Sequence, residues 1–258
     1  QPLYSLGITG VFTKDLDIAL LNNEIDIAVH SLKDVPTILP QNIEVSAVLE
    51  RDFPQDVLVR KSSSKNKDLA ELKIATSSLR RRAFWSEKFP NTQFSDIRGN
   101  VQTRLKKLEE GDFDATLFSL AGIKRMEMEL EYEMLDFMIS APSQGVVAIS
   151  SRVDDVETKA ILQKINHKTT QICVEIERNF LRTLEGGCTA PIGAIAVFEE
   201  NKIKFSGRLN SLDGSKTISV VEEFEYDDSE NYGKKFAEFV LENGGKEMME
   251  EIKKQIKE

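Results

Sequence analysis

The apolar residues of the chain alternate between helical spacing and short strand-like runs, a pattern typical of α/β proteins. Leu16, Ile18, Leu20 and Leu21 predict a helix that Thr13 can cap. The run 25–29 predicts a buried strand that ends in the polar loop 30–36, and a further strand is predicted at 45–49. In open α/β sheets ligands bind at such strand ends.

The alternation restarts after residues 51–54, which we interpret as a first crossover between two α/β units. Strands are predicted at 56–60, 73–76, 94–97 and 115–119, and helices at 78–88 and around Val101, Leu105 and Leu108. The runs 138–141 and 146–150 predict returning strands, separated by a second crossover at 142–145.

A third pattern begins near Thr169. A helix is predicted at 174–184, ending at Gly186-Gly187, followed by strands at 192–198, 202–209 and 215–224. A charged amphipathic helix is predicted at 232–257, with an interruption at Gly244-Gly245. Strands followed by a helix indicate a small α+β domain.

Composition narrows the function classes. A chain of 258 residues suits two or three domains, and a formal charge of −9 argues against broad nucleic-acid binding. No apolar run is long enough to span a bilayer and no signal peptide is visible, so we expect no membrane partner and a cytoplasmic location. Cys173 and Cys188 form no CxxC pair and only two histidines are present, so no metal site is predicted and a disulfide is the weaker interpretation.

Basic side chains follow three of the predicted strands. Arg80, Arg81 and Arg82 begin a helix after Thr76 and Ser78, where cations are normally disfavoured unless an anion is bound. The alternative is a solvated basic helix face. Further along the chain, the next two strand ends carry Arg98 with Arg104, and Lys124 with Arg125. Three basic strand ends on one rim favour a cleft for a ligand with several carboxylates or phosphates, and no nucleotide motif is present.

Lys33 and Asp34 would face that rim from the first unit. Together they could orient an anion and move a proton, although Asp34 could instead stabilise its loop as an Asx turn. Cys188 follows two glycines that allow a tight approach, and a thiolate can form a thioether. The alternative for Cys188 is a small buried thiol, an interpretation that suits Cys173 well.

Taken together, the motifs resemble the hydroxymethylbilane synthase family, also called porphobilinogen deaminase. The resemblance extends over nearly the whole chain in the family's order, and it rests on the stretches 10–14, 26–36, 76–81, 98–105, 143–145 and 184–193.

The resemblance implies an α/β fold with two periplasmic-binding-protein-like α/β domains and a small α+β C-terminal domain that carries the cofactor cysteine. The domains would span 1–50 with 146–166, then 54–141, and then 169–258. A dipyrromethane cofactor would be attached by a thioether to Cys188. The enzyme, expected to be a monomer, would condense four porphobilinogen units with loss of ammonia and release hydroxymethylbilane by hydrolysis.

The resemblance also implies residue roles. Asp34 would be the catalytic carboxylate, stabilising the electron-deficient methylene-pyrrolenine, and Phe12 would lie on a mobile loop near the cleft. The acetate and propionate groups would be held by Ser31, Lys33, Thr76, Ser78, Arg80, Arg81, Arg98, Arg104 and Arg125.

The sequence departs from the family pattern at its start. The family begins with a strand–helix–strand unit bearing an active-site arginine before the stretch at Gly10, and that unit is not present in this sequence. A non-enzymatic anion-binding module of periplasmic-binding-protein type is therefore kept as an alternative. A regulatory effector domain of similar fold is disfavoured because no DNA-binding segment is visible.

Overall fold

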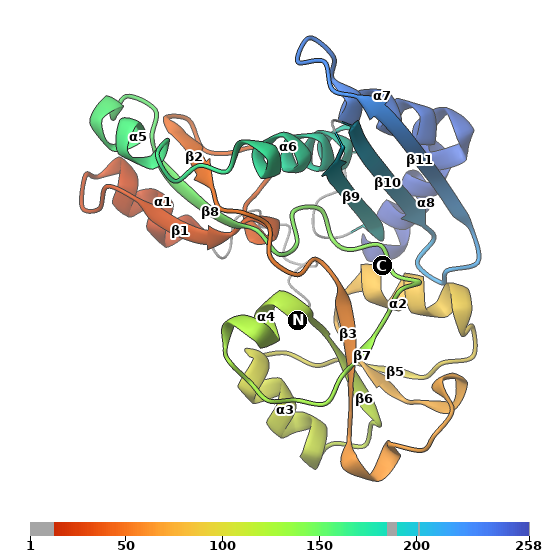
Figure 1. Cartoon of the computed structure of the whole chain (residues 1–258). Helices are drawn as coiled ribbons and strands as arrows, with labels where there is room; N and C mark the ends of the chain where they lie inside the picture. The colour runs from red at the N-terminus through yellow and green to blue at the C-terminus, as the bar shows by residue number, and fades with distance from the viewer. Residues whose placement is uncertain (1–12, 185–189, 201, 258) are drawn as a thin grey trace.

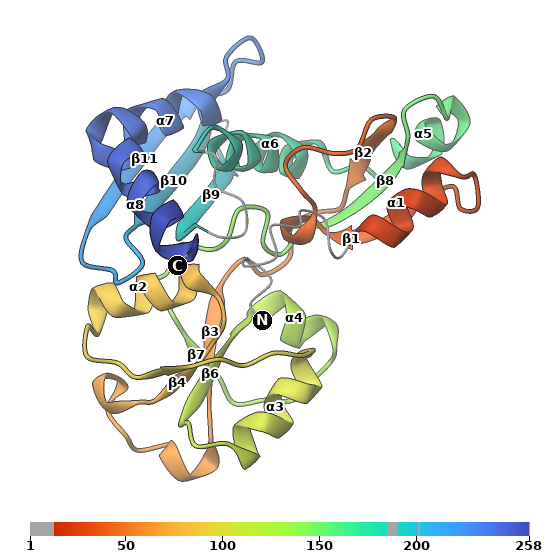
Figure 2. The same cartoon turned by 180° about the vertical axis from the view of Figure 1, so that it is seen from behind.

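The structure is a computed structural model of the chain, and it describes residues 13–184, 190–200 and 202–257. Three sheets, which we name A, B and C, organise the molecule. Sheets A and C lie side by side in the upper half of Figure 1, and sheet B lies below them. The reverse view in Figure 2 shows α2 (Leu79–Lys88) between sheet B and sheet C.

Sheet A has the strand order β1-β8-β2 and is antiparallel throughout its described strands. Its strands are β1 (Ala28–Ser31), β8 (Val147–Arg152) and β2 (Ile43–Val48). The helices α1 (Lys14–Leu21) and α5 (Val156–Leu162) pack against it. A 3₁₀ turn, η2 (Leu32–Asp34), follows β1 directly, so the end of this strand sets the position of Lys33 and Asp34.

Sheet B has the order β5-β4-β6-β3-β7. Its strands are β5 (Phe94–Ser95), β4 (Ile74–Ala75), β6 (Ala115–Ser119), β3 (Asp56–Arg60) and β7 (Glu133–Met134). The neighbours β5, β4 and β6 are parallel, linked through α2 and α3 (Val101–Glu110), whereas β3 is antiparallel to both β6 and β7. The three strand ends predicted to share one rim therefore do belong to adjacent parallel strands. The short helix α4 (Leu120–Arg125) follows β6, and two 3₁₀ turns, Ser62–Ser64 and Leu69–Glu71, follow β3.

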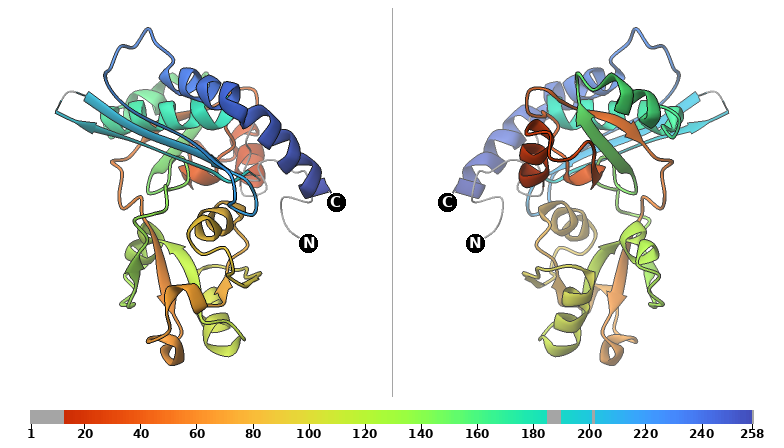
Figure 3. Two further views of the ribbon diagram at one scale, coloured as in Figure 1. Left: turned by 90° about the vertical axis from the view of Figure 1, so that its right-hand side faces the viewer. Right: turned by 90° about the vertical axis from the view of Figure 1, so that its left-hand side faces the viewer.

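Sheet C is an antiparallel meander of β9 (Ile192–Glu199), β10 (Lys202–Asn210) and β11 (Thr217–Glu225). It packs with α6 (Lys168–Thr183), α7 (Tyr232–Val240) and α8 (Lys246–Lys257) around a core that contains the buried rings of Phe180, Phe205 and Phe236. The last two helices are separated by a π-helical kink, Leu241–Gly245, where Gly244 has φ +99°. In Figure 3 these helices form a long arm on one side of the sheet.

The predicted fold class, α/β with a small C-terminal α+β unit, agrees with these three sheets, but three element predictions were wrong in detail. The strand predicted at 138–141 is not one: Met138 and Ile139 pack into the core of sheet B, while Ile139 O and Ser140 O accept from Arg80 Nη1 and Ala194 N at 2.7 and 3.0 Å. The helix predicted at 174–184 starts at Lys168, where His167 is the N-cap. Its first turn is polar, so the apolar pattern did not include it. The strand predicted at 25–29 begins only at Ala28.

Candidate active site at the junction of sheets A and B

Asp56, at the start of β3, binds two arginines from the first turn of α2. Its Oδ1 accepts from Arg81 Nε and Nη2 at 3.0 and 2.8 Å, and its Oδ2 lies 2.7 Å from Arg80 Nη2. All three side chains are buried. Burial alone would raise the pKa of Asp56, but the two guanidinium groups outweigh it and hold that pKa below its usual value. The sequence predicted an anion at this helix start, and the structure places a protein carboxylate there.

The helix start that presents these arginines is fixed locally. Ser78 is the N-cap of α2, and its hydroxyl accepts from Arg81 N at 3.3 Å. Thr76 is buried, and its Oγ1 accepts from Ser78 N at 3.3 Å. Arg82, by contrast, leaves the cluster and pairs with the exposed Asp96. The two hydroxyl residues predicted as ligands therefore shape the turn in this structure.

Arg104 of α3 joins the cluster from the other side of β6. Its Nη2 donates to Thr116 Oγ1 at 3.0 Å and to Leu117 O at 2.6 Å, a carbonyl that also accepts from Arg81 Nη1 at 2.9 Å. Burial, and then the charge of Arg81, lower the pKa of Arg104 to about 9. No ion pair joins Arg104 to a carboxylate of the described residues, and its Nε has no partner among them. A cation in this position is suited to an external carboxylate.

Lys33 and Asp34 reach the same region from sheet A. Burial, then Arg81, lower the pKa of Lys33 to about 8, against the opposing effect of Asp34. Burial raises the pKa of Asp34, while Lys33, His30 and Arg81 oppose that shift. The charge of Arg81 thus lowers the pKa of Lys33, of Asp34 and of Arg104, so all three groups interact electrostatically with the same arginine.

Gln144 is the residue that connects the two sides, and the sequence reasoning gave it no role. It is 1% exposed; its Oε1 accepts from Lys33 Nζ at 3.4 Å, and its Nε2 donates to Pro54 O at 2.6 Å and to Asp56 Oδ1 at 3.2 Å. Asp56 was likewise missed. The signal available for it was a carboxylate at the head of an otherwise apolar strand, 56–60, which must be paired when buried.

The two crossovers lie against one another behind this cluster. Asp52 N donates to Gly145 O at 2.9 Å. Gly145 has φ +84°, and a Cβ there would meet Phe53 O at 3.0 Å, so the position requires glycine. The paired segments form the link between sheets A and B.

Glu177 of α6 ties the paired crossovers to sheet C. Its fully buried carboxylate accepts from Arg51 Nη2 at 2.6 Å, from Ser143 N at 2.6 Å and from Ala196 N at 2.8 Å. The three donors belong to the first crossover, the second crossover and β9. One carboxylate therefore holds all three units at their meeting point, a role that the sequence did not indicate.

The remaining predicted residues are less closely joined. Ser31 ends β1 and is half-buried. Arg98, after β5, and Arg125, at the end of α4, are exposed, and among the described residues no side-chain hydrogen bond or ion pair joins either of them to the cluster. Phe12 and Cys188 lie outside the described residues. Cys173 is free and buried, which confirms the prediction of a small buried thiol, and burial raises its pKa to about 11.

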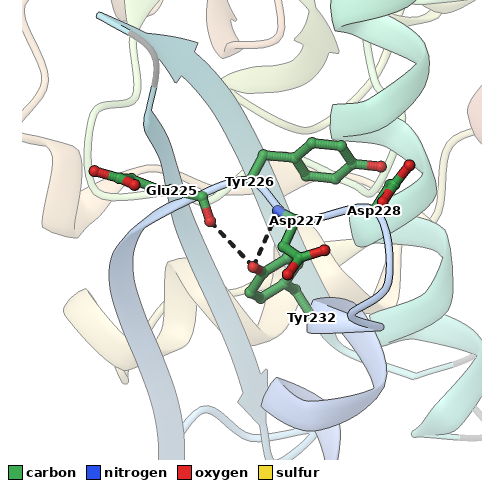
Figure 4. Close-up of a pocket in the computed structure, with 5 residues that line it drawn as sticks. All are labelled: Glu225, Tyr226, Asp227, Asp228 and Tyr232. Atoms are coloured by element: carbon green, nitrogen blue, oxygen red, sulfur yellow. Dashed lines mark hydrogen bonds between the residues drawn. The ribbon is translucent and has the colours of Figure 1, made fainter.

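A surface cavity of about 660 Å³ lies far from this cluster, beside the start of α7. Figure 4 shows its lining: Tyr232 OH donates to Glu225 O and accepts from Asp227 N, and Asp228 adds a further carboxylate. An acidic lining repels a carboxylated ligand, so the cavity does not compete with the arginine cluster. Within the described ranges no group of three or more His, Cys, Asp or Glu could hold a metal ion, and no described helix could cross a membrane.

Comparison with known proteins identifies the family. A family model described as "Porphobilinogen deaminase, dipyromethane cofactor binding domain" matches residues 1–160, and one described as "Porphobilinogen deaminase, C-terminal domain" matches residues 171–242. The chain belongs to the porphobilinogen deaminase family. Members of this family are transferases of tetrapyrrole biosynthesis with a dipyrromethane cofactor, so the predicted enzyme class and cofactor are confirmed.

Curated relatives agree over most of the chain. A "Probable porphobilinogen deaminase" of Methanocaldococcus jannaschii is 51% identical over 204 residues, which cover 78% of this chain and 69% of the relative. The porphobilinogen deaminase of Desulfitobacterium hafniense is 40% identical over 256 residues, covering 98% of this chain and 82% of the relative.

The solved structures that match include an arginine transport periplasmic binding protein of Legionella pneumophila. It is 19% identical with a TM-score of 0.33, and the match covers 58% of this chain and 69% of that one. The L-cystine solute receptor of Neisseria gonorrhoeae is 18% identical with a TM-score of 0.34, covering 68% and 80%. Similarities of this size support no conclusion about this chain.

Proposed function

We propose that the cluster formed by Asp34, Lys33, Arg80, Arg81 and Arg104 is where this chain condenses porphobilinogen units. The observation that supports this most strongly is the excess of positive charge: four cationic side chains face two carboxylates, Asp34 and Asp56. Each porphobilinogen ring carries two carboxylates, so a ligand of several rings needs such an excess. Arg104, which has no carboxylate partner among the described residues, fits the cofactor's acidic side chains in particular.

In each cycle porphobilinogen loses ammonia from its aminomethyl carbon, a new carbon–carbon bond forms at that carbon, and the acceptor ring loses a proton. Asp34 is placed to stabilise the electron-deficient species formed when ammonia leaves, because a partly desolvated carboxylate acts strongly on a nearby cation. The raised pKa of Asp34 also suits it to accept and return a proton. Lys33, protonated below about pH 8, would orient a substrate carboxylate beside it.

The dipyrromethane cofactor supplies the acceptor pyrrole onto which units are added, and Cys188 is proposed to carry it. We further propose carboxylate-binding roles for Ser31, Thr76, Ser78, Arg98 and Arg125, with Phe12 on a mobile loop. Arg98 follows β5 and Arg125 ends α4, the helix after β6; both strands belong to the parallel set β5-β4-β6, which supports a position on the rim beyond the central cluster.

The unit boundaries are part of the same proposal: 1–50 with 146–166, then 54–141, then 169–258. The strands of sheets A, B and C fall inside these three ranges in turn. A monomeric enzyme of the cytoplasm is proposed as well. Light scattering after gel filtration tests the oligomeric state, and a dimer mass would contradict it.

The activity is tested by mixing the purified chain with porphobilinogen and measuring ammonia release together with porphobilinogen consumption. One ammonia per porphobilinogen consumed, with a linear tetrapyrrole as product, is the expected result. Reversible binding of porphobilinogen without ammonia release would contradict the proposal.

A further inference from the structure

The loop that carries Asp34 is held from below by one face of α6. Val174 and Arg178 lie one helical turn apart on that face. Val174 belongs to the same buried core as Leu32, the first residue of the η2 turn. The helix therefore packs directly beneath the residue that precedes Lys33 and Asp34.

Arg178 supplies hydrogen bonds to the backbone on both sides of Asp34. Its Nη1 donates to Leu32 O at 3.4 Å and to Val35 O at 3.0 Å, and its Nη2 donates to Pro36 O at 2.6 Å. Residues 35–42 form no helix or strand, so regular backbone pairing does not hold this stretch. Carbonyls at the end of a short helical turn need such donors, and a guanidinium fork can serve several of them at once.

The contacts of Arg178 are to carbonyls, and no ion pair joins it to a described carboxylate. Burial, and then the nearby Arg182, lower its pKa to about 10, so it stays charged at neutral pH. A small cavity of about 80 Å³ lies beside it, lined by side chains that include Leu32, Val174 and Arg178. The small cavity thus lies beside the loop, and the Arg178 guanidinium donates the hydrogen bonds that hold the loop backbone there.

The position of Arg178 along the chain gives this anchor a functional meaning. The helix α6 belongs to the unit of sheet C, and it ends at Thr183, shortly before Cys188 in the sequence. We propose that Arg178 is a positioning residue for Asp34, through which the cofactor-bearing unit fixes the catalytic carboxylate relative to the growing ligand. This inference rests on the proposed role of Asp34.

The test compares Arg178→Lys with Arg182→Lys, the same chemical change one helical turn further along. Arg182 is exposed and bonds only to Asn179 among the described contacts, at 2.8 Å. In Arg178→Lys we expect faster amide hydrogen exchange in the peptide covering residues 32–36, together with a kcat lowered by about 10²-fold and little change in KM. Arg182→Lys should leave both quantities at wild-type values.

The pH profile provides a readout that a purely structural role would not move. Burial raises the pKa of Asp34, whereas the charged groups that act on it, Lys33, His30 and Arg81, oppose that shift. A loosened loop exposes Asp34 to water, so the acid limb of the kcat profile should move to lower pH in Arg178→Lys. Arg182→Lys should keep the wild-type acid limb.

Unchanged exchange and an unchanged acid limb in folded Arg178→Lys would overturn the inference. An Arg178→Gln variant, which keeps two N–H donors without the charge, is measured alongside. Failure of both variants to fold would also overturn it, because Arg178 would then be a general stability residue. The exchange experiment needs no turnover, so loss of the proposed activity in the wild-type protein is distinguished from failure of this inference.

Discussion

Lys33 Nζ lies 3.4 Å from Gln144 Oε1, joining the loop after β1 to the second crossover. Through Gln144 the lysine is connected to Asp56 and so to Arg81. The contact holds Lys33, in the turn after β1, close to the cations of sheet B, among which Arg81 lowers its pKa most. It also makes the charge of Lys33 sensitive to pH in a range that can be measured.

Activity should fall on the alkaline side near pH 8, where Lys33 loses its proton. Since its folded pKa lies below the unfolded value, the unfolded chain binds more protons between about pH 8 and 10.5, and this group's contribution to stability rises with pH there. In Lys33→Arg the guanidinium stays charged, so the alkaline limb of kcat/KM should move upward. The exposed Lys65→Arg serves as control, and identical limbs in wild type and Lys33→Arg would refute the assignment.

Asp56→Asn should destabilise the protein strongly, because two buried guanidinium groups lose their shared carboxylate. Breaking a buried pair in this way costs about 3–5 kcal/mol, measured as the free energy of unfolding in urea. The matched control is Asp96→Asn. This substitution removes the exposed partner of Arg82, which lies in the same helix as Arg80 and Arg81, and it should cost less than about 1 kcal/mol. Equal effects of the two substitutions would show that Asp56 is not the counter-ion of the cluster.

Much of this arrangement could be predicted from the sequence. The periodicity of apolar residues located most helices and strands, and basic residues after successive strands indicated the rim on which Arg80, Arg81 and Arg104 converge. These features are local in sequence. The contacts of Asp56, Gln144 and Glu177 join residues 19 to 126 positions apart, so no sequence spacing predicts them.

Side-chain partners also decided what the local pattern left open. Arg82 and Arg81 are neighbours in the same basic run, yet one pairs with exposed Asp96 and the other with buried Asp56. The run 138–141 has the composition of a strand but contributes carbonyls to Arg80 and Ala194. A segment that packs into a core without pairing with a strand gives the same apolar signal as a buried strand, which is why the strand prediction failed.

Glu177→Gln should weaken the meeting point of the three units. The carboxylate accepts from three N–H groups, and a glutamine must turn its own N–H₂ group toward one of them while leaving Arg51 without its counter-ion. A loss of about 3–5 kcal/mol in unfolding free energy is expected. Glu175→Gln, on the exposed side of the same helix, should change stability by well under 1 kcal/mol, as is usual for surface positions. A similar loss in both variants would argue against a special role for Glu177.

The role of Asp34 is tested most directly by intact-protein mass spectrometry of wild type and Asp34→Ala, before and after addition of limiting porphobilinogen. Before addition, both proteins should carry the mass of a two-ring pyrrole group, and Cys188→Ser should lack it. After addition, the wild type should show species heavier by successive pyrrole units, and Asp34→Ala should show none while keeping its initial load. The same ladder in Asp34→Ala, or a wild-type protein without any initial load on Cys188, would contradict the proposed site.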